Sequence, residues 1–230
     1  MKTMTSLALL FLLNTVAAQD QSPEQLIHKT RQKLERVSDY VASGKMKMNI
    51  SFLKAPVADV KIYYKKPDKL KIHNENGISL IPKGSVNISM GSIVAQADQC
   101  DLIDGGREAQ TGLRIIKLLP KEDEADIVLS VLYIDEKRGL IKKAKTTTKE
   151  NGTYELAMEY GKYADYGLAD KVTFTFNTKD YKMPKGVTFD YDDGSNRQRD
   201  ENGMKEKKGT VEISYAEYKI NKGIPDSAFK

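Results

Sequence analysis

The middle of the chain alternates apolar segments with short polar turns, a pattern that predicts four consecutive antiparallel strands. The segments are residues 113–119, 127–134, 140–148 and 153–160. Asn151-Gly152 precedes the last segment, and both residue types tolerate the positive φ of a tight hairpin. Apolar and polar residues alternate in 153–160, which predicts one covered and one wet face. Segment 127–134 is almost uniformly apolar, which predicts a strand covered on both faces.

The pattern near the N-terminus has a helical period. Ser22-Pro23-Glu24-Gln25 is a capping box with proline at the first helical position. Apolar residues then recur at helical spacing until Gly44, so the sequence predicts an amphipathic helix over 22–43. We expect its apolar stripe to pack on the core. A membrane-surface role is less favoured because the polar face mixes charge signs.

Alternation also predicts strands in most of the remaining chain. These strands are expected at 45–52, 60–65, 69–73, 78–81, 86–90, 171–176, 187–191 and 211–220. In the last strand the apolar parity changes near Ala216, which indicates a β-bulge and a bend. Asn76-Gly77 predicts a further hairpin, and 192–209 reads as a long polar loop.

The segment 92–103 fits two structures. Its apolar spacing fits a short helix that Gly105-Gly106 would end, but a strand fits nearly as well. The fold class predicted is mainly antiparallel β with few helices. About ten strands in one domain require strong curvature, because a flat open sheet of that size is rare.

The first eighteen residues have the features of an export signal. Lys2 precedes an apolar run, and Val16-Ala17-Ala18 fits the small-residue cleavage rule. The run is too short to span a bilayer. We therefore expect residues 1–18 to be a cleaved signal peptide and 19–230 to be a single domain, soluble and outside the cytoplasm.

Charge and cysteine content exclude several classes of site. The net charge is +5, but the basic residues are spread along the chain and match no nucleic-acid motif, so no nucleic-acid partner is expected. Cys100 is the only cysteine, which excludes an intrachain disulfide and a thiolate metal site. We expect Cys100 to act as a small buried apolar residue.

No catalytic or metal-binding motif is present. The two histidines, His28 and His73, have no acidic residue or cysteine at ligand spacing. The polar loop around Asp190 and Asp192 resembles a calcium loop only loosely, because its glycine falls one place early. A solvated loop is the better interpretation. We expect neither an enzyme nor a cofactor or metal.

The apolar residues themselves are the candidate functional feature. Met46, Met48 and Met158 share the predicted covered face with several tyrosines. Methionine is flexible, so such a surface can adapt to ligands of varied shape. The same stripe is more often plain core, and both interpretations stay open at this stage.

Four stretches together resemble the LolA-like family of bacterial outer-membrane lipoprotein-sorting proteins. They are VSDYVASGKMKMNI at the end of the first helix, VKIYYKKPDKLKI, the region from IIKLLPKEDEADIVL to ENGTYELAMEY, and the closing YKINKGIPDSAF. The resemblance rests on the order of these stretches and covers nearly all of residues 19–230.

The resemblance implies an open half-barrel of about eleven antiparallel strands, with helices that cover a hydrophobic cavity. Known members carry the acyl chains of lipoproteins across the periplasm or bind other lipids. It therefore implies a periplasmic carrier, monomeric, with an inner-membrane donor and an outer-membrane acceptor. Where the family commonly has an arginine for cargo handling, this chain has Lys71. Where the family tends to have an aromatic residue after the Asn-Gly turn, it has Ile78 and Leu80.

On this basis we expect the helix 22–43 and segment 92–103 to form a lid. The cavity lining expected beneath it is Met46, Met48, Ile50, Val60, Ile62, Tyr64, Leu70, Ile72, Leu156, Met158, Phe174 and Phe176. Two other functions remain open: an envelope sensor with the same fold, and an exported structural β-protein with a filled core.

Overall fold

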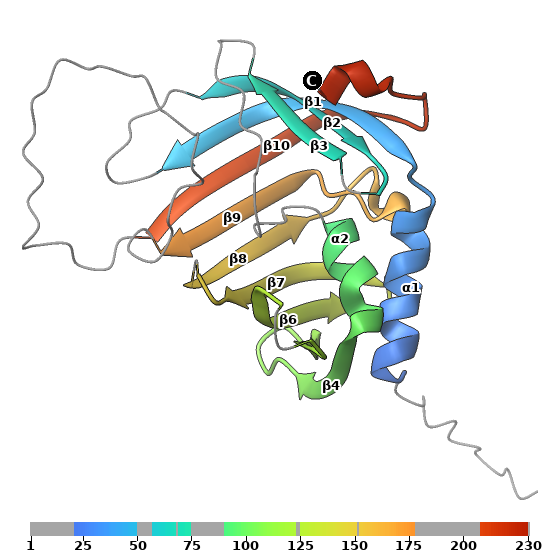
Figure 1. Cartoon of the computed structure of the whole chain (residues 1–230), viewed down its shortest axis with the longest axis vertical. Coiled ribbons are helices and arrows are strands. Elements are labelled where there is room, and N and C mark those ends of the chain that lie inside the picture. The colour runs from blue at the N-terminus through green and yellow to red at the C-terminus, as the bar shows by residue number, and fades with distance from the viewer. Residues whose placement is uncertain are drawn as a thin grey trace, which may run out of the picture.

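The computed structural model describes residues 21–49, 57–67, 69–74, 90–122, 125–150, 152–177 and 208–229. Within them, one antiparallel sheet has the strand order β3-β2-β1-β10-β9-β8-β7-β6-β5-β4 (Figure 1). The strands are β1 (Asp39–Asn49), β2 (Ala58–Lys65), β3 (Lys69–Asn74), β4 (Cys100–Arg107), β5 (Arg114–Pro120), β6 (Ile127–Asp135), β7 (Leu140–Thr148), β8 (Gly152–Glu159), β9 (Lys171–Asn177) and β10 (Lys208–Ile220).

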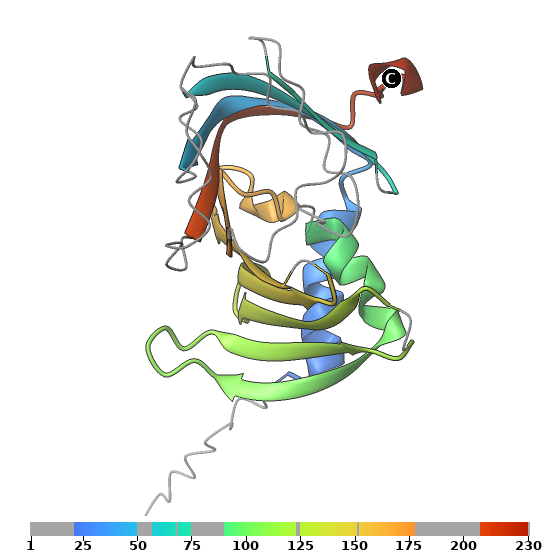
Figure 2. The ribbon, with the colours of Figure 1, turned by 60° about the vertical axis from the view of Figure 1, so that its left-hand side comes forward.

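Helices are few, as the sequence predicts. They are α1 (Pro23–Glu35), α2 (Met90–Ala95) and the 3-10 turns η1 (Gln96–Gln99), η2 (Ala164–Tyr166) and η3 (Asp226–Phe229). Figure 1 shows α1 and α2 side by side against one face of the sheet. The sheet is strongly curved (Figure 2). It is also open, because β3 and β4 stand at the two ends of the strand order and do not pair with each other. The predicted open half-barrel of mainly antiparallel strands is confirmed.

The central meander follows the predicted pattern closely. Strands β5 to β8 each begin and end within one residue of the predicted bounds. The turns before β7 and β8 use Gly139 and Gly152 at φ of 61° and 64°, values that glycine adopts without strain. Local alternation and turn chemistry are therefore sufficient to define this part of the sheet.

The prediction that 127–134 is covered on both faces is wrong. Leu132 and Ile134 are buried under the helices, whereas Val128 is 43% exposed. The helices cover only one face of the sheet, so the other face of β6 stays partly exposed although it is apolar. The buried face instead includes a polar residue, Ser130, whose hydroxyl bonds that of Thr146 at 3.1 Å.

The N-terminal helix is shorter than its pattern predicts. The capping box forms, since the Ser22 Oγ accepts from the Gln25 N–H and the Gln25 Oε1 accepts from the Ser22 N–H. However, α1 ends at Glu35, and β1 begins at Asp39 between β2 and β10. Backbone pairing on both sides of β1 therefore outweighs the helical period of residues 37–43, and the helix predicted over 22–43 is corrected to Pro23–Glu35.

The ambiguous segment 92–103 contains both predicted structures. The helix continues to Ala95 and η1 to Gln99, and β4 begins at Cys100. Gly105 and Gly106 do not end a helix but lie within β4. Met90 begins α2, where the sequence predicts the end of a strand.

Several predicted elements lie outside the described residues. They are residues 86–89 of the strand predicted over 86–90, the strands 78–81 and 187–191, the Asn76-Gly77 hairpin, the polar loop up to residue 207, and residues 1–20.

The first and last strands pair around a β-bulge. Ser43 lies opposite Glu217 and Gly44 opposite Tyr215, so Ala216 is the extra residue, and the bulge predicted near Ala216 is confirmed. Gly44 permits the close approach, because a Cβ at this position would lie 2.4 Å from the Ser214 carbonyl oxygen. Figure 2 shows β1, β2, β3 and β10 arching over the concave side of the sheet.

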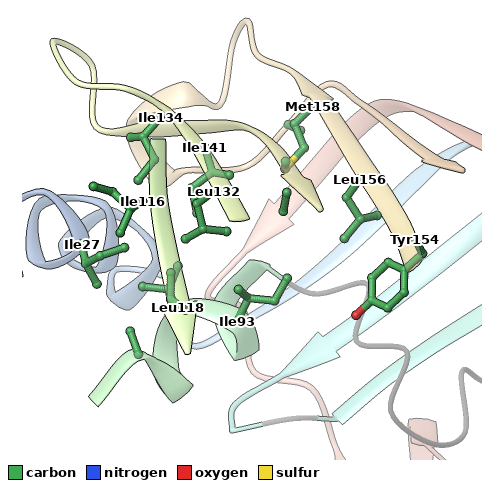
Figure 3. Packing of buried hydrophobic residues seen from close by; sticks show 14 of the residues in the cluster. Ile27, Ile93, Ile116, Leu118, Leu132, Ile134, Ile141, Tyr154, Leu156 and Met158 are labelled. Carbon is green, nitrogen blue, oxygen red and sulfur yellow. The ribbon is translucent and has the colours of Figure 1, made fainter. Parts of the chain in front are cut away.

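The buried side chains form two clusters on the concave face. The helix cluster joins α1, α2 and η1 to β5–β9, and Figure 3 shows its side chains meeting from helices and strands. The arch cluster joins β1, β2, β3 and β10 and includes Val37 and Leu168. Val211 of β10 packs against both clusters, so the boundary between them runs along the concave face near β9 and β10.

We predict that Gly44→Ala destabilises the fold by about 1–3 kcal/mol, the usual range for overpacking. The added methyl group collides with backbone, which cannot move away without breaking the β1–β10 ladder. Urea denaturation should show the loss. The control is Ser43→Ala, a half-buried neighbour that should change stability by about 0.5 kcal/mol or less; equal midpoints for the two variants would contradict the tight-bend interpretation.

A second prediction concerns Asn221, which has a φ of 54° and fastens the α1–β1 junction. Its Oδ1 accepts from the Ser38 N–H at 2.7 Å and its Nδ2 donates to the Arg36 carbonyl at 2.7 Å. Asn221→Ala should cost about 1–2 kcal/mol, because these exposed hydrogen bonds are lost and alanine tolerates a positive φ less well than asparagine. Thermal unfolding measures this loss. Lys222→Ala is the control, and a loss as large there would show that the Asn221 amide is unimportant.

Candidate functional site

A cavity of about 70 Å³ lies where the two clusters meet. Its described lining comes from the end of α1 and the segment between α1 and β1, from α2, from five strands and from the loop between β8 and β9. The lining residues within the described ranges are Leu34, Val37, Tyr40, Tyr64, Gly91, Leu156, Met158, Tyr160, Gly167, Leu168, Ala169, Val172, Tyr215 and Tyr218. We call this the seam cavity. The side chains of this described lining are apolar apart from tyrosine hydroxyls.

Four of the tyrosines form a continuous aromatic group. Tyr40 and Tyr64 face each other across β1 and β2, with ring centroids 5.1 Å apart. Tyr218 lies 5.2 Å from Tyr40 and 5.0 Å from Tyr215. Such offset and edge contacts suit aromatic rings. The group forms the arch side of the seam cavity.

The bulge at Ala216 places two of these rings together. Residues three apart in a regular strand point to opposite faces. The extra residue restores the parity, so Tyr215 lies opposite Gly44 and Tyr218 opposite Ala42, both of which are buried positions on β1. The deviation from regular strand structure is therefore what builds the aromatic side of the cavity.

Two tyrosine hydroxyls in the cavity wall donate to backbone carbonyls. Tyr218 donates to Ala169 at 2.7 Å and Tyr160 donates to Ile141 at 2.8 Å. Within the described chain, the Tyr40 hydroxyl makes no hydrogen bond. The hydrogen bonds of Tyr218 and Tyr160 each tie two segments of the cavity wall together.

The tyrosines are neutral at physiological pH. Burial raises the pKa of Tyr40, Tyr160 and Tyr218 well above the ordinary tyrosine value. Burial also raises the pKa of Tyr215 to about 12, against a smaller lowering by its hydrogen bond with Tyr218. The hydroxyls can therefore donate or accept hydrogen bonds, but none is a phenolate that could act as base or nucleophile.

The helical cover is fastened by a few polar contacts. Arg31 of α1 bonds both carboxylate oxygens of Asp98 in η1, at 2.8 and 2.9 Å, and the Val94 carbonyl at 3.0 Å. Lys29 of α1 donates to the Glu136 carbonyl at 2.8 Å. Asp98 is 74% exposed, and exposed ion pairs contribute little stability. The cover is thus held mainly by its apolar side chains and only weakly by charge.

The loop between β8 and β9 turns into the concave side (Figure 2). Leu168 packs in the arch cluster and Ala169 in the helix cluster. Gly167 adopts a φ of 67°, and a Cβ there would lie 3.0 Å from Leu34 of α1. This loop closes the seam cavity between the helix and the strands. The sequence predicts a loop over these residues but gives no sign that it folds inward.

The twelve residues predicted to line the cavity are divided between core and cavity. Met46, Val60, Ile62, Tyr64 and Ile72 are buried in the arch cluster, and Met48 and Leu70 pack against it. Leu156, Met158, Phe174 and Phe176 belong to the helix cluster. Of these, Tyr64, Leu156 and Met158 line the seam cavity; Ile50 lies outside the described residues. Strand parity therefore identifies the residues of the concave face, but it does not distinguish those that line the cavity from those that fill the core.

Lys71, to which the family resemblance assigns cargo handling, does not line this cavity. It pairs with Tyr63, on the face opposite to Ile62 and Ile72. Its Nζ donates to the Ala228 carbonyl in η3 at 3.0 Å. A role for Lys71 in cargo handling stays a prediction.

The described residues offer little else for chemistry. The Cys100 thiol donates to the Gln96 carbonyl at 3.4 Å, and burial raises its pKa, so it is protonated at neutral pH. No group of three or more histidine, cysteine or acidic side chains within the described ranges could hold a metal ion. Among the same residues, no helix has both the length and the hydropathy to cross a membrane.

Comparison with known proteins yields matches by structure and none by sequence. No family model and no curated protein matches the chain. A LolA superfamily protein from Nitrosomonas europaea superposes with a TM-score of 0.54 at 8% identity, covering 92% of this chain and 98% of that one.

Two other solved structures are similar to the same degree. A putative outer membrane lipoprotein-sorting protein domain from Vibrio parahaemolyticus has a TM-score of 0.53 at 11% identity and covers 91% and 97% of the two chains. A DUF1329 family protein from Desulfovibrio piger has 0.53 at 13%, covering 90% and 95%. Identities this low show the fold alone, so this chain is similar in fold to these three proteins.

Proposed function

We propose that this protein is an exported lipid-binding carrier that takes up acyl chains at the seam cavity. The observation that carries the proposal is a cavity between two clusters, lined from the described chain by uncharged residues only, whose side chains are apolar or tyrosine. A surface of this kind binds hydrocarbon and excludes water. The protein would act in the periplasm as a monomer, after cleavage of residues 1–18.

The cargo proposed is the acyl part of lipoproteins or other lipids, passed from an inner-membrane donor to an outer-membrane acceptor. The similar domain from Vibrio parahaemolyticus is described as lipoprotein-sorting. That likeness supports lipoprotein sorting as the transport step.

The size of the cavity sets a requirement on the mechanism. A cavity of roughly 150 Å³ holds one benzene molecule, whereas the seam cavity measures about 70 Å³. An acyl chain can therefore enter only if the seam widens. The weakly fastened helical cover and the inward loop are the elements whose displacement would widen it, and Met158 can change rotamer at low cost.

Widening also makes release possible. Each buried CH₂ contributes about 0.8 kcal/mol, so a sixteen-carbon chain would gain roughly 12 kcal/mol in a rigid, preformed cavity. A carrier that bound so tightly could not pass its cargo on. The free energy needed to separate the two clusters offsets part of this gain and brings the net affinity into a range that allows transfer.

The small cavity also favours a second function, an exported structural β-protein whose concave side is simply filled. In that case the cover would not open, and no lipid would bind. The two functions differ in one measurable property, the uptake of an acyl ligand at the seam.

We predict that Val172→Trp lowers the affinity for a fluorescent monoacylglycerol at least tenfold. Val172 is half-buried on the cavity side of β9, so the indole would occupy the seam without replacing a fully buried core residue. Titration of the probe measures the affinity. The matched control is Thr173→Trp, one residue along the strand on the opposite face, which should bind normally. Equal binding by both variants would show that the seam is not the lipid site.

We also predict that Asp98→Asn speeds uptake of the same probe, by roughly two- to fivefold, because the exposed Arg31–Asp98 pair holds α1 to η1. Stopped-flow fluorescence measures the rate. Asp59→Asn, which removes an ion pair with Lys45 between β1 and β2, is the control. An unchanged rate in Asp98→Asn would show that this pair does not restrain the cover.

The same pair gives a pH dependence. The hydrogen bond from Arg31 lowers the pKa of Asp98 below its usual value of 3.8. The contribution of the pair is therefore complete above that value and is lost as the pH falls through the lowered pKa. Uptake by the wild-type protein should accelerate over this acid range relative to Asp98→Asn.

A further inference from the structure

We propose that the seam cavity selects lipids whose polar group next to the acyl chain is uncharged, such as an ester, an amide or a glycerol hydroxyl. Lipids with an ionised carboxylate or phosphate at that position should bind more weakly. This inference rests on the proposed function and names the class of cargo for the same site.

The first reason is the absence of a counter-charge. Among the described residues that line the cavity, none is charged at neutral pH. A carboxylate drawn into such a site loses its hydration without gaining an ion pair, which is costly. An ester carbonyl loses far less and needs only a single hydrogen-bond donor.

The second reason is the kind of polar group that is present. The polar side-chain groups of the described lining are tyrosine hydroxyls, and those of Tyr160 and Tyr218 already donate to backbone carbonyls. The Tyr40 hydroxyl makes no hydrogen bond in the described part of the chain, although its ring packs on Tyr64 and Tyr218. It is therefore a neutral donor held in place by its ring contacts and free to bind a carbonyl oxygen.

The third reason is that charged groups on the elements carrying the lining already have partners. On α1, Arg31 is engaged with Asp98, and Lys33 lies 3.8 Å from Asp165 and 3.4 Å from the Ala164 carbonyl. On β2, Lys65 bonds Asp226 in η3 at 2.7 Å.

These three cations are thus paired with carboxylates or bonded to carbonyls, and none belongs to the described lining. The Nζ of Lys142 lies 5.4 Å from the centroid of the Tyr160 ring, and Lys142 does not belong to the described lining either. Asp170 follows the loop between β8 and β9 and brings negative charge near Tyr218. Burial is the main cause that raises the pKa of Tyr218, and the charge of Asp170 adds to it. On the Tyr218 side of the cavity, this local charge disfavours an anion further.

The test compares three ligands of one chain length on the wild-type protein at pH 7.5. Laurate, methyl laurate and 1-lauroylglycerol compete against the fluorescent monoacylglycerol below their aggregation concentrations. The two neutral ligands should compete at least tenfold better than laurate. Equal affinities would overturn the inference and leave the carrier function standing. Binding of none of the three would overturn both.

A variant tests the donor. Tyr40→Phe keeps the ring and its stacking but removes the hydroxyl, so the affinity for methyl laurate should fall about three- to tenfold, the effect of one hydrogen bond. Binding of dodecane, which has no polar group, should not change. The matched control is Tyr63→Phe. Tyr63 precedes Tyr64 on β2 and lies on the opposite face of the sheet from Tyr40 and Tyr64, so this variant should bind both ligands as the wild type does. An equal loss of affinity for dodecane, or no loss of affinity for methyl laurate, would show that the Tyr40 hydroxyl does not bind the polar group of the ligand.

Discussion

The pairing of the first strand with the last one is the constraint on which the rest of the structure depends. β1 and β10 lie more than 150 residues apart in sequence, and their ladder joins the arch strands to the central meander. At Gly44 the two backbones approach so closely that no side chain fits. Opposite it, the extra residue Ala216 bends β10 and turns Tyr215 and Tyr218 to the same side. One local irregularity therefore produces both the curvature and the aromatic wall of the candidate site.

The bend divides the concave face into two apolar clusters, because the helices lie on one half of the sheet and the arch strands form the other. Where the clusters meet, the inward loop between β8 and β9 leaves only a small cavity. Each cluster is well buried, whereas the two are joined by Val211, which packs against both, and by the hydrogen bond from the Tyr218 hydroxyl to the Ala169 carbonyl. Separation of the clusters should therefore cost less free energy than unfolding either one. Because separation costs less free energy than unfolding, a concave face that is filled in the absence of lipid can still open to take up a lipid.

The sequence predicts those parts of the fold that local pattern controls. Alternation and turn glycines define β5 to β8, and the parity change at Ala216 by itself indicates the bulge. Prediction from sequence fails where contacts with distant segments determine the local structure. The helical period continues past Glu35, but the side chain of Asn221 and the backbones of β2 and β10 hold the following residues in a strand. For the site, parity places Met46 and Ile62 correctly on the concave face. It does not show that they fill the core while Tyr40, Tyr215 and the loop line the cavity, because that depends on the bend and on the inward loop.

Native mass spectrometry of the full chain, purified gently from bacterial envelopes and then incubated with acylglycerol vesicles, tests the central claim most directly. If the two clusters can separate to admit an acyl chain, the spectrum will contain protein with one bound lipid. The adduct should be displaced by a competing neutral lipid. A spectrum with only lipid-free protein, both as purified and after incubation, would contradict the account and would identify the concave side as a permanently filled core.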